Sequence, residues 1–152
     1  MAPILKPELF PKPEALLRLT VSYGETDRMG YAYYGHYPHW FERARGFFIR
    51  ERGMSYGEVE RRGVWLPVRD MAIRYMRPAR YDEDVAVRVG IAAWGRASIT
   101  FVYQVFGPPD ASVLLAAGET VHGVAEGDER PHDRIPLCMK PDIWLVVYAR
   151  VH

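Results

Sequence analysis

The stretch that decides the fold is residues 23–45, which read YGETDRMGYAYYGHYPHWFERAR. Before it, residues 16–23 alternate apolar and polar side chains, which is the period of a half-buried strand. Residues 24–33 are rich in Gly, Asp and Thr and predict a loop. From Gly35 or His36 onward, apolar side chains recur at spacings of three and four: Tyr37, Trp40, Phe41, Ala44, Phe47 and Phe48. The pattern predicts a strand, a loop and then a buried helix that stops at Gly53.

After this helix the apolar period changes to two. Ser55 and Glu58 have the spacing of a capping box and predict one more short helix, ended by Gly63. Strands are then predicted within residues 65–76, 85–91, 99–105 and 113–121. The short connection at 94–96 predicts a hairpin. Because strands follow strands, we expect an α+β domain with one long helix on a mostly antiparallel sheet. The apolar run 142–149 fits either a strand or a helix.

Length and composition indicate one globular domain. We expect an extended, proline-rich arm at 1–13 and a single domain at 14–152. The net charge of +1 gives no reason to expect nucleic acid or a membrane as partner. The single cysteine, Cys138, excludes an internal disulfide, and no signal peptide is recognisable at the start. These features predict a cytoplasmic protein.

The loop and the helix start together suggest acyl-transfer chemistry. Asp27 lies on the loop, and the N-terminus of the helix beyond it offers free backbone N–H groups. Such N–H groups can bind an oxyanion, while a carboxylate on the other side acts as a base or a nucleophile. An isolated Asp in such a loop is more often a turn former.

The same residues resemble the 4-hydroxybenzoyl-CoA thioesterase family of hotdog proteins. The resemblance covers about residues 16–125 and consists of Tyr23, Thr26, Asp27, Gly30, Tyr33, Tyr37, Phe41, Glu42, Ala44 and Arg45. It implies a hotdog fold, in which a five-stranded antiparallel sheet wraps around one long helix. It also implies hydrolysis of acyl-CoA thioesters without metal or cofactor, in a homodimer or homotetramer with sites at the subunit interface.

The resemblance also assigns roles within the site. Asp27 is the implied catalytic acid, and the amide that polarises the thioester carbonyl belongs to Tyr34 or Gly35. Glu25 stands where an Asp is common and His36 where many members carry Asn, so the acyl preference stays open. The family commonly contacts coenzyme A near Arg96 and Ser98, although a hairpin-end charge in water explains Arg96 equally well.

Other side chains have simpler interpretations. Tyr31 and Tyr33, on the loop, are candidates to shape an acyl pocket, and His36 is a candidate to line it. His36 and His39 lack further ligands for a zinc site. Glu42 and Arg45 are expected to form an ion pair on a solvated helix face.

Two other functions stay open. One is a hydratase or dehydratase on acyl thioesters, which usually carries an Asp/His helix motif that this chain lacks. The other is a non-catalytic protein that binds acyl-CoA or an acyl-carrier protein, which would not need Asp27.

Overall fold

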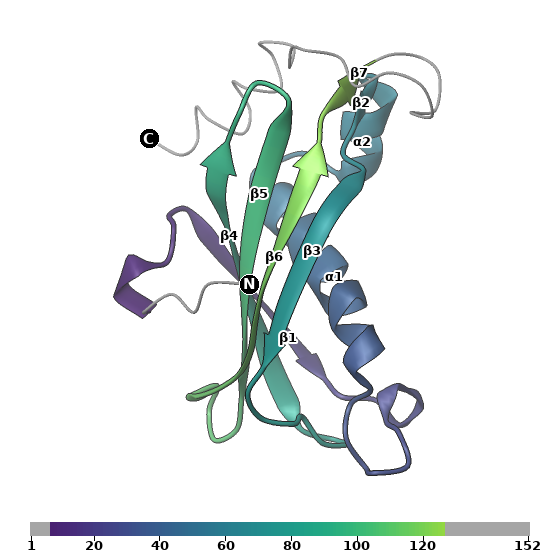
Figure 1. Cartoon of the computed structure of the whole chain (residues 1–152), viewed down its shortest axis with the longest axis vertical. Helices are drawn as coiled ribbons and strands as arrows, with labels where there is room; N and C mark the ends of the chain where they lie inside the picture. The colour runs from purple at the N-terminus through teal and green to yellow at the C-terminus, as the bar shows by residue number, and fades with distance from the viewer. Residues whose placement is uncertain (1–6, 127–152) are drawn as a thin grey trace.

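The structure, a computed structural model, describes residues 7–126 (Figure 1). The strands are β1 (Glu14–Thr20), β2 (Val64–Trp65), β3 (Val68–Tyr75), β4 (Asp84–Trp94), β5 (Ser98–Gly107), β6 (Val113–Gly123) and β7 (Ala125–Glu126). The α-helices are α1 (Tyr37–Glu51) and α2 (Tyr56–Arg61). Turns of 3₁₀ helix occupy Pro7–Leu9, Tyr23–Glu25 and Tyr34–His36. The run 142–149 and Cys138 lie outside the described residues.

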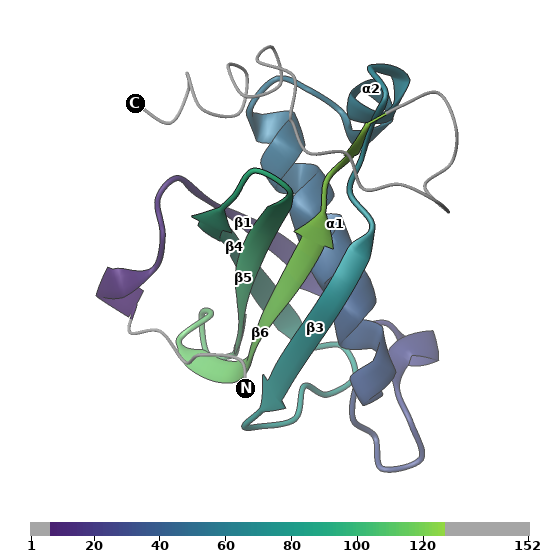
Figure 2. The ribbon, with the colours of Figure 1, turned by 45° about the horizontal axis from the view of Figure 1, so that its top comes forward.

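One antiparallel sheet forms most of the domain. Its five strands lie in the order β1-β4-β5-β6-β3, and the sheet curves around α1 (Figures 1 and 2). The predicted α+β class and the predicted arrangement of sheet and helix are confirmed. A second, two-stranded sheet of β2 and β7 was not predicted, because two-residue strands show no periodicity.

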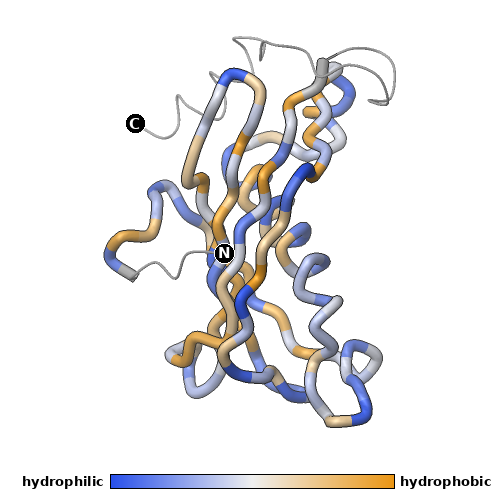
Figure 3. The backbone as a smooth tube through the Cα atoms, in the orientation of Figure 1, coloured by the Kyte–Doolittle hydropathy of each residue, from blue (hydrophilic) through white to orange (hydrophobic). Residues whose placement is uncertain are grey.

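The buried face of α1 supplies the centre of the core. Trp40, Phe41 and Ala44 are fully buried, and Phe41 stacks on Tyr103 of β5 with ring centroids 4.1 Å apart. Gly118 of β6 leaves room for Phe41, since a Cβ there would lie 2.4 Å from a Phe41 ring carbon. Figure 3 shows apolar and polar residues alternating along the strands, with a strongly hydrophilic stretch in the loop before α1.

Several predicted boundaries shift by a few residues. The first strand covers Glu14–Thr20 rather than 16–23, because the chain turns into a 3₁₀ helix at Tyr23–Glu25. The long helix begins at Tyr37, after a separate 3₁₀ turn, with Pro38 in its first turn, where no N–H donor is needed. β3 starts only at Val68, since Pro67 cannot donate to a ladder.

The predicted helix signals are confirmed. Gly53 and Gly63 follow α1 and α2 with positive φ angles of 88° and 79°. The Ser55 side chain accepts a hydrogen bond of 3.1 Å from the Glu58 N–H at the start of α2. The hairpin between β4 and β5 is also present.

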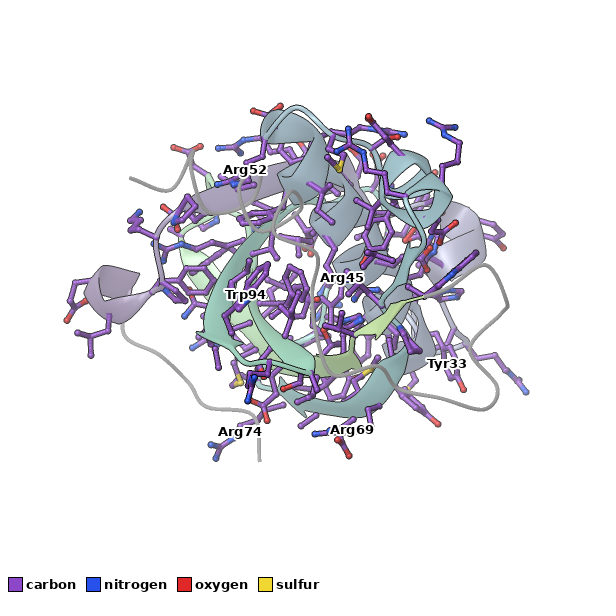
Figure 4. The ribbon with its side chains drawn as sticks, turned by 90° about the horizontal axis from the view of Figure 1, so that it is seen from above. Tyr33, Arg45, Arg52, Arg69, Arg74 and Trp94 are labelled. Atoms are coloured by element: carbon purple, nitrogen blue, oxygen red, sulfur yellow. The ribbon has the colours of Figure 1, made fainter. Side chains whose placement is uncertain are left out.

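Arg45 corrects one prediction. It does not pair with Glu42 on a solvated face; it is 7% exposed, and its guanidinium donates to the Tyr103 hydroxyl at 3.0 Å. Figure 4 shows it between α1 and the sheet. The spacing of three placed both side chains on one helix face, but the sheet curves far enough to cover Arg45.

Arg45 begins a buried chain of hydrogen bonds. The Tyr103 hydroxyl lies 2.8 Å from the Thr120 hydroxyl, which lies 2.8 Å from Nε2 of His122. Nδ1 of His122 lies 2.9 Å from the Leu66 carbonyl oxygen. Every group has a donor and an acceptor if His122 is neutral and carries its proton on Nδ1, which is the assignment we infer.

Part of the predicted N-terminal arm packs on β4. Pro7–Leu9 forms a turn of 3₁₀ helix rather than extended chain. Phe10 is 3% exposed, and the Arg88 guanidinium lies 4.2 Å from the centre of its ring. Gly90 allows this approach, since a Cβ there would lie 2.9 Å from the Pro11 carbonyl oxygen.

Candidate active site

The loop that carries Asp27 is a tight hairpin. The Asp27 N–H donates to the Tyr31 carbonyl at 2.8 Å, and the Gly30 N–H donates to the Asp27 carbonyl at 3.0 Å. Gly30 has φ +77°, a left-handed conformation that glycine adopts without strain. Thr26 and Ala32 form a β-bridge next to this turn. The loop lies beside the start of α1 (Figure 1), and Asp27 lines a pocket together with Tyr34 and Tyr37.

The two carboxylate oxygens of Asp27 are used differently. Oδ1 accepts from the Met29 N–H at 2.8 Å and, more weakly, from the Tyr31 N–H at 3.4 Å. Oδ2 has no hydrogen-bond partner among residues 7–126, and Asp27 lines a pocket. The bond that makes Asp27 a turn former fixes the carboxylate and leaves the other oxygen available for chemistry.

The start of the helix presents free backbone donors. In the 3₁₀ turn, the N–H groups of His36 and Tyr37 donate to Tyr33 and Tyr34. The N–H groups of Tyr34 and Gly35 have no acceptor in the described part of the chain, as expected for the first residues of a helix. A Cβ at Gly35 would lie 2.6 Å from the Tyr33 ring, so a side chain at this position would require that ring to move.

A pocket of about 300 Å³ joins Asp27 to the helix start. Its lining residues are Asp27, Met29, Tyr31, Ala32, Tyr34, Tyr37, Tyr75, Met76, Arg77 and Pro78. The predicted residues Asp27, Tyr31 and Tyr34 therefore meet in one pocket. Tyr33 and His36 lie beside it: the Tyr33 ring packs 4.5 Å from the Tyr34 ring and 5.8 Å from the His36 ring.

Tyr75 is a pocket residue that the sequence did not single out. Its hydroxyl donates to the Tyr34 carbonyl at 2.9 Å, and its ring meets the Tyr37 ring edge-on at 5.0 Å. Burial raises the pKa of Tyr37 to about 12, so its hydroxyl stays protonated at neutral pH. Tyr75 falls within the strand predicted in 65–76, but the alternation there contains no signal that this strand meets the helix start.

Glu25 connects the loop to the helix. Its two carboxylate oxygens accept from the Ser22 hydroxyl at 2.9 Å and from Nε1 of the buried Trp40 at 2.8 Å. The Tyr33 N–H donates to the Glu25 carbonyl at 2.8 Å. Glu25, which stands where the family commonly has Asp, therefore helps to hold the loop against α1.

Arg96 and Ser98 lie at the other end of the sheet. Arg96 lies in the turn between β4 and β5, and Ser98 is the first residue of β5. The loop before α1 and the start of α1 are at the opposite end of the sheet (Figure 1). Arg96 is exposed, and the Ser98 carbonyl accepts from the Gly95 N–H at 2.8 Å. A single chain does not bring these two residues to the pocket.

The described residues offer neither a metal site nor a membrane-spanning helix. Residues 7–126 contain no group of three His, Cys, Asp or Glu side chains placed to hold a metal ion. Over the same residues, no helix has the length and apolar character needed to span a membrane.

Similarity to known proteins identifies the family of this chain. A protein of Bacillus subtilis with the provisional name acyl-CoA thioesterase YneP is 33% identical over 90 residues, which make up 59% of this chain and 65% of that protein. The chain thus matches less than two thirds of that relative's length.

Solved structures match over more of the chain. A hypothetical protein from Thermus thermophilus is 34% identical, with a TM-score of 0.77 over 91% of this chain and 98% of its own. The DHNA-CoA thioesterase from Staphylococcus aureus is 26% identical, with a TM-score of 0.74 over 91% of this chain and 87% of its own. Residues 21–143 match the model of the thioesterase-like superfamily. The matched range includes the whole Asp27 loop and α1. This chain therefore belongs to the thioesterase-like superfamily and has the hotdog fold of its thioesterases.

Proposed function

We propose that this protein hydrolyses acyl-CoA thioesters to a free acid and coenzyme A. One observation carries the proposal: Asp27, with one free carboxylate oxygen, and Tyr34, at a helix start whose first N–H groups are free, line the same pocket. The proposal is also supported by the names of the relatives and by membership in the superfamily.

The free N–H groups of Tyr34 and Gly35 would bind the thioester oxygen. As the carbonyl carbon becomes tetrahedral, its oxygen takes up negative charge, which fixed backbone donors stabilise more than they stabilise the neutral carbonyl. The carbon–sulfur bond then breaks, and coenzyme A leaves as a thiolate that takes up a proton.

Asp27 can act in either of two ways. As a base, its free oxygen takes a proton from water while the water oxygen forms the new bond to carbon. As a nucleophile, it forms a mixed anhydride with loss of the thiolate, and water then hydrolyses the anhydride. A single turnover in ¹⁸O-labelled water identifies the nucleophilic route when water attacks the Asp27 carboxyl carbon of the anhydride. The first product then keeps an unlabelled Asp27 oxygen and Asp27 gains ¹⁸O, whereas the base route places ¹⁸O directly in the product acid.

The remaining predicted binding residues belong to the same proposal. Tyr31 contacts the acyl group in the pocket, and Tyr33 and His36 contact the substrate at its edge. Arg96 and Ser98 act on coenzyme A from a second subunit, since they lie far from the pocket of their own chain. No metal or cofactor takes part, and the single cysteine favours a cytoplasmic location.

A homo-oligomer would complete the site. β3 is an edge strand of the sheet, and no strand within residues 7–126 pairs with its outer edge. Exposed apolar side chains gather on β3 and beside the pocket: Val68, Met71, Tyr75, Met76 and Tyr34. Pairing of two β3 strands would cover them and extend the sheet across two subunits.

The decisive experiment is a thiol-release assay over a panel of acyl-CoAs. Asp27→Asn is expected to lower kcat by about 10²- to 10⁴-fold while thioester binding persists. Asp110→Asn, at the exposed turn between β5 and β6, is the matched control and is expected to keep the wild-type rate. A wild-type rate for Asp27→Asn would refute the assigned role. Binding of coenzyme A without hydrolysis of any ester would favour the non-catalytic alternative.

The oligomer is tested separately by light scattering. Met71 on β3 and Leu16 on β1, the other edge strand, are each 42% exposed. Met71→Glu is expected to yield monomers with little activity, whereas Leu16→Glu keeps both the molar mass and the rate. Equal behaviour of the two variants would contradict pairing through β3.

A further inference from the structure

The buried Arg45 guanidinium has no negative partner. Its hydrogen bonds go to the neutral hydroxyls of Tyr103 and Tyr56. Its Nε atom is buried and has no acceptor among residues 7–126. Within the same residues, no carboxylate forms an ion pair with it.

Such an arrangement is costly for a cation. Burial removes hydration, and hydroxyl groups replace only part of it, because they carry dipoles and no charge. A buried guanidinium is best stabilised by an anion that accepts two parallel N–H bonds. Arg45 therefore favours an anion beside it.

Arg45 lines a groove that has space for such an anion. The groove has a volume of about 550 Å³. It is bounded by Leu17, Glu42, Arg43, Arg45, Gly46, Phe47, Arg50, Tyr56, Glu60 and Leu66. Three arginines thus face two glutamates, which gives the lining an excess of positive charge. The volume is in the range of small-molecule sites, about 300–1,000 Å³.

The outer face of α1 forms the floor of this groove. Arg43, Gly46, Phe47 and Arg50 follow at spacings of three and four and so lie on one helix face. A Cβ at Gly46 would have no atom within 4 Å. Glycine inside a helix costs about 1 kcal/mol relative to alanine, and no neighbour in the described residues requires it. Gly46 leaves the floor open between the two arginines.

We propose that this groove is a second binding site, distinct from the Asp27 pocket, for an amphipathic organic carboxylate. The carboxylate pairs with Arg45 and with Arg43 or Arg50 at the groove. The apolar part of the ligand lies on the apolar lining residues Phe47, Leu17 and Leu66. Inorganic phosphate would match the arginines but leave these apolar side chains uncovered. The inference does not depend on thioesterase activity, because it uses none of the residues of the Asp27 pocket.

The test is calorimetric titration of the full-length protein with octanoate, octanamide and inorganic phosphate. The titration uses the wild-type protein, because none of the three ligands is a thioester. Octanoate is expected to bind at one saturable site and more tightly than phosphate. Octanamide, which has the same chain without the charge, is expected to bind about tenfold more weakly or worse.

Four variants locate the site. Arg43→Gln combined with Arg50→Gln is expected to weaken octanoate binding about tenfold, while the matched change Arg61→Gln on the exposed face of α2 leaves it unchanged. Gly46→Phe fills the groove and abolishes binding. Gly46→Ala, which adds one methyl group to open space, keeps it and shows that the helix tolerates substitution.

Four results would overturn the proposal. The first is the absence of octanoate binding, and the second is equal affinity for octanoate and octanamide. The third is binding that Gly46→Phe and the double arginine variant leave unchanged. A change in molar mass on Gly46→Phe would also overturn it, since the groove would then be a contact between copies of this chain.

Discussion

The Tyr75 hydroxyl donates a hydrogen bond of 2.9 Å to the Tyr34 carbonyl oxygen. This bond connects the edge strand β3 to the helix start that carries the proposed oxyanion site. The two rings also meet edge-on, with centroids 6.3 Å apart. Tyr75 is therefore placed to hold the backbone of Tyr34, whose N–H is one of the two free donors.

Tyr75→Phe tests this positioning role. Loss of one hydrogen bond is worth about 1 kcal/mol, so kcat is expected to fall about fivefold. Because the phenyl ring keeps its packing, KM and the melting temperature are expected to change little. Tyr81→Phe removes a hydroxyl outside the pocket lining and serves as control. An unchanged kcat for Tyr75→Phe would exclude the role.

The contact between Glu25 and Trp40 is expected to hold the Asp27 loop on α1. Trp40→Phe leaves a void in the core and a Glu25 oxygen without its donor, which should lower the free energy of unfolding by about 2–4 kcal/mol. Glu25→Gln keeps a neutral acceptor and should cost about 1 kcal/mol. Urea unfolding measures both variants. Equal losses would show that the hydrogen bond, rather than the packing of Trp40, accounts for the whole effect.

Gly118 and Gly57 are expected to respond oppositely to alanine. At Gly118 the new methyl group would overlap the buried Phe41 ring and lie 3.2 Å from the Ala72 carbonyl oxygen. Gly118→Ala should therefore lower stability by about 1–3 kcal/mol. At Gly57, in α2, the methyl group meets nothing within 4 Å, so alanine should stabilise by up to about 1 kcal/mol. Denaturant midpoints of the two variants check the signs.

His122 predicts a loss of stability in acid. Burial lowers the pKa of His122 below its usual value of 6.5, and nearby Arg45 acts in the same direction, against the Leu66 carbonyl. Between the lowered folded pKa and 6.5 the unfolded chain binds more protons, so this contribution is complete above pH 6.5 and is lost as pH falls through the folded pKa. The free energy of unfolding is therefore expected to fall more steeply across this pH window in wild type than in His122→Gln. Equal slopes for the two proteins would show that His122 is not the cause.

Much of the fold followed from periodicity. The three- and four-residue spacing from Tyr37 to Phe48 predicted α1, and the two-residue spacing in 85–91 and 99–105 predicted two central strands. Helix ends were readable at Gly53 and Gly63, because glycine adopts positive φ more readily than other residues. The exact ends of the elements next to the 3₁₀ turns before α1 could not be predicted, because turns of three residues show no detectable repeat.

The candidate site was only partly readable. The Asp27 loop and the helix start are adjacent in the sequence, so their meeting in one pocket could be predicted. Tyr75 and Arg77 reach the same pocket from more than 40 positions further along the chain, and no local pattern encodes that approach. Arg45 was misread for the same reason, because its partner Tyr103 is 58 residues away.

The sequence by itself determined the elements and the chemistry of this protein: which segments become helix or strand, and which loop carries a carboxylate before a helix start. These depend on side-chain periodicity and on residues close along the chain. Only the tertiary structure decided which oxygen of Asp27 is free, that Tyr75 holds Tyr34, and that Arg45 is buried without an anion. These depend on how far the sheet curves around α1, which results from the packing of side chains distant in sequence.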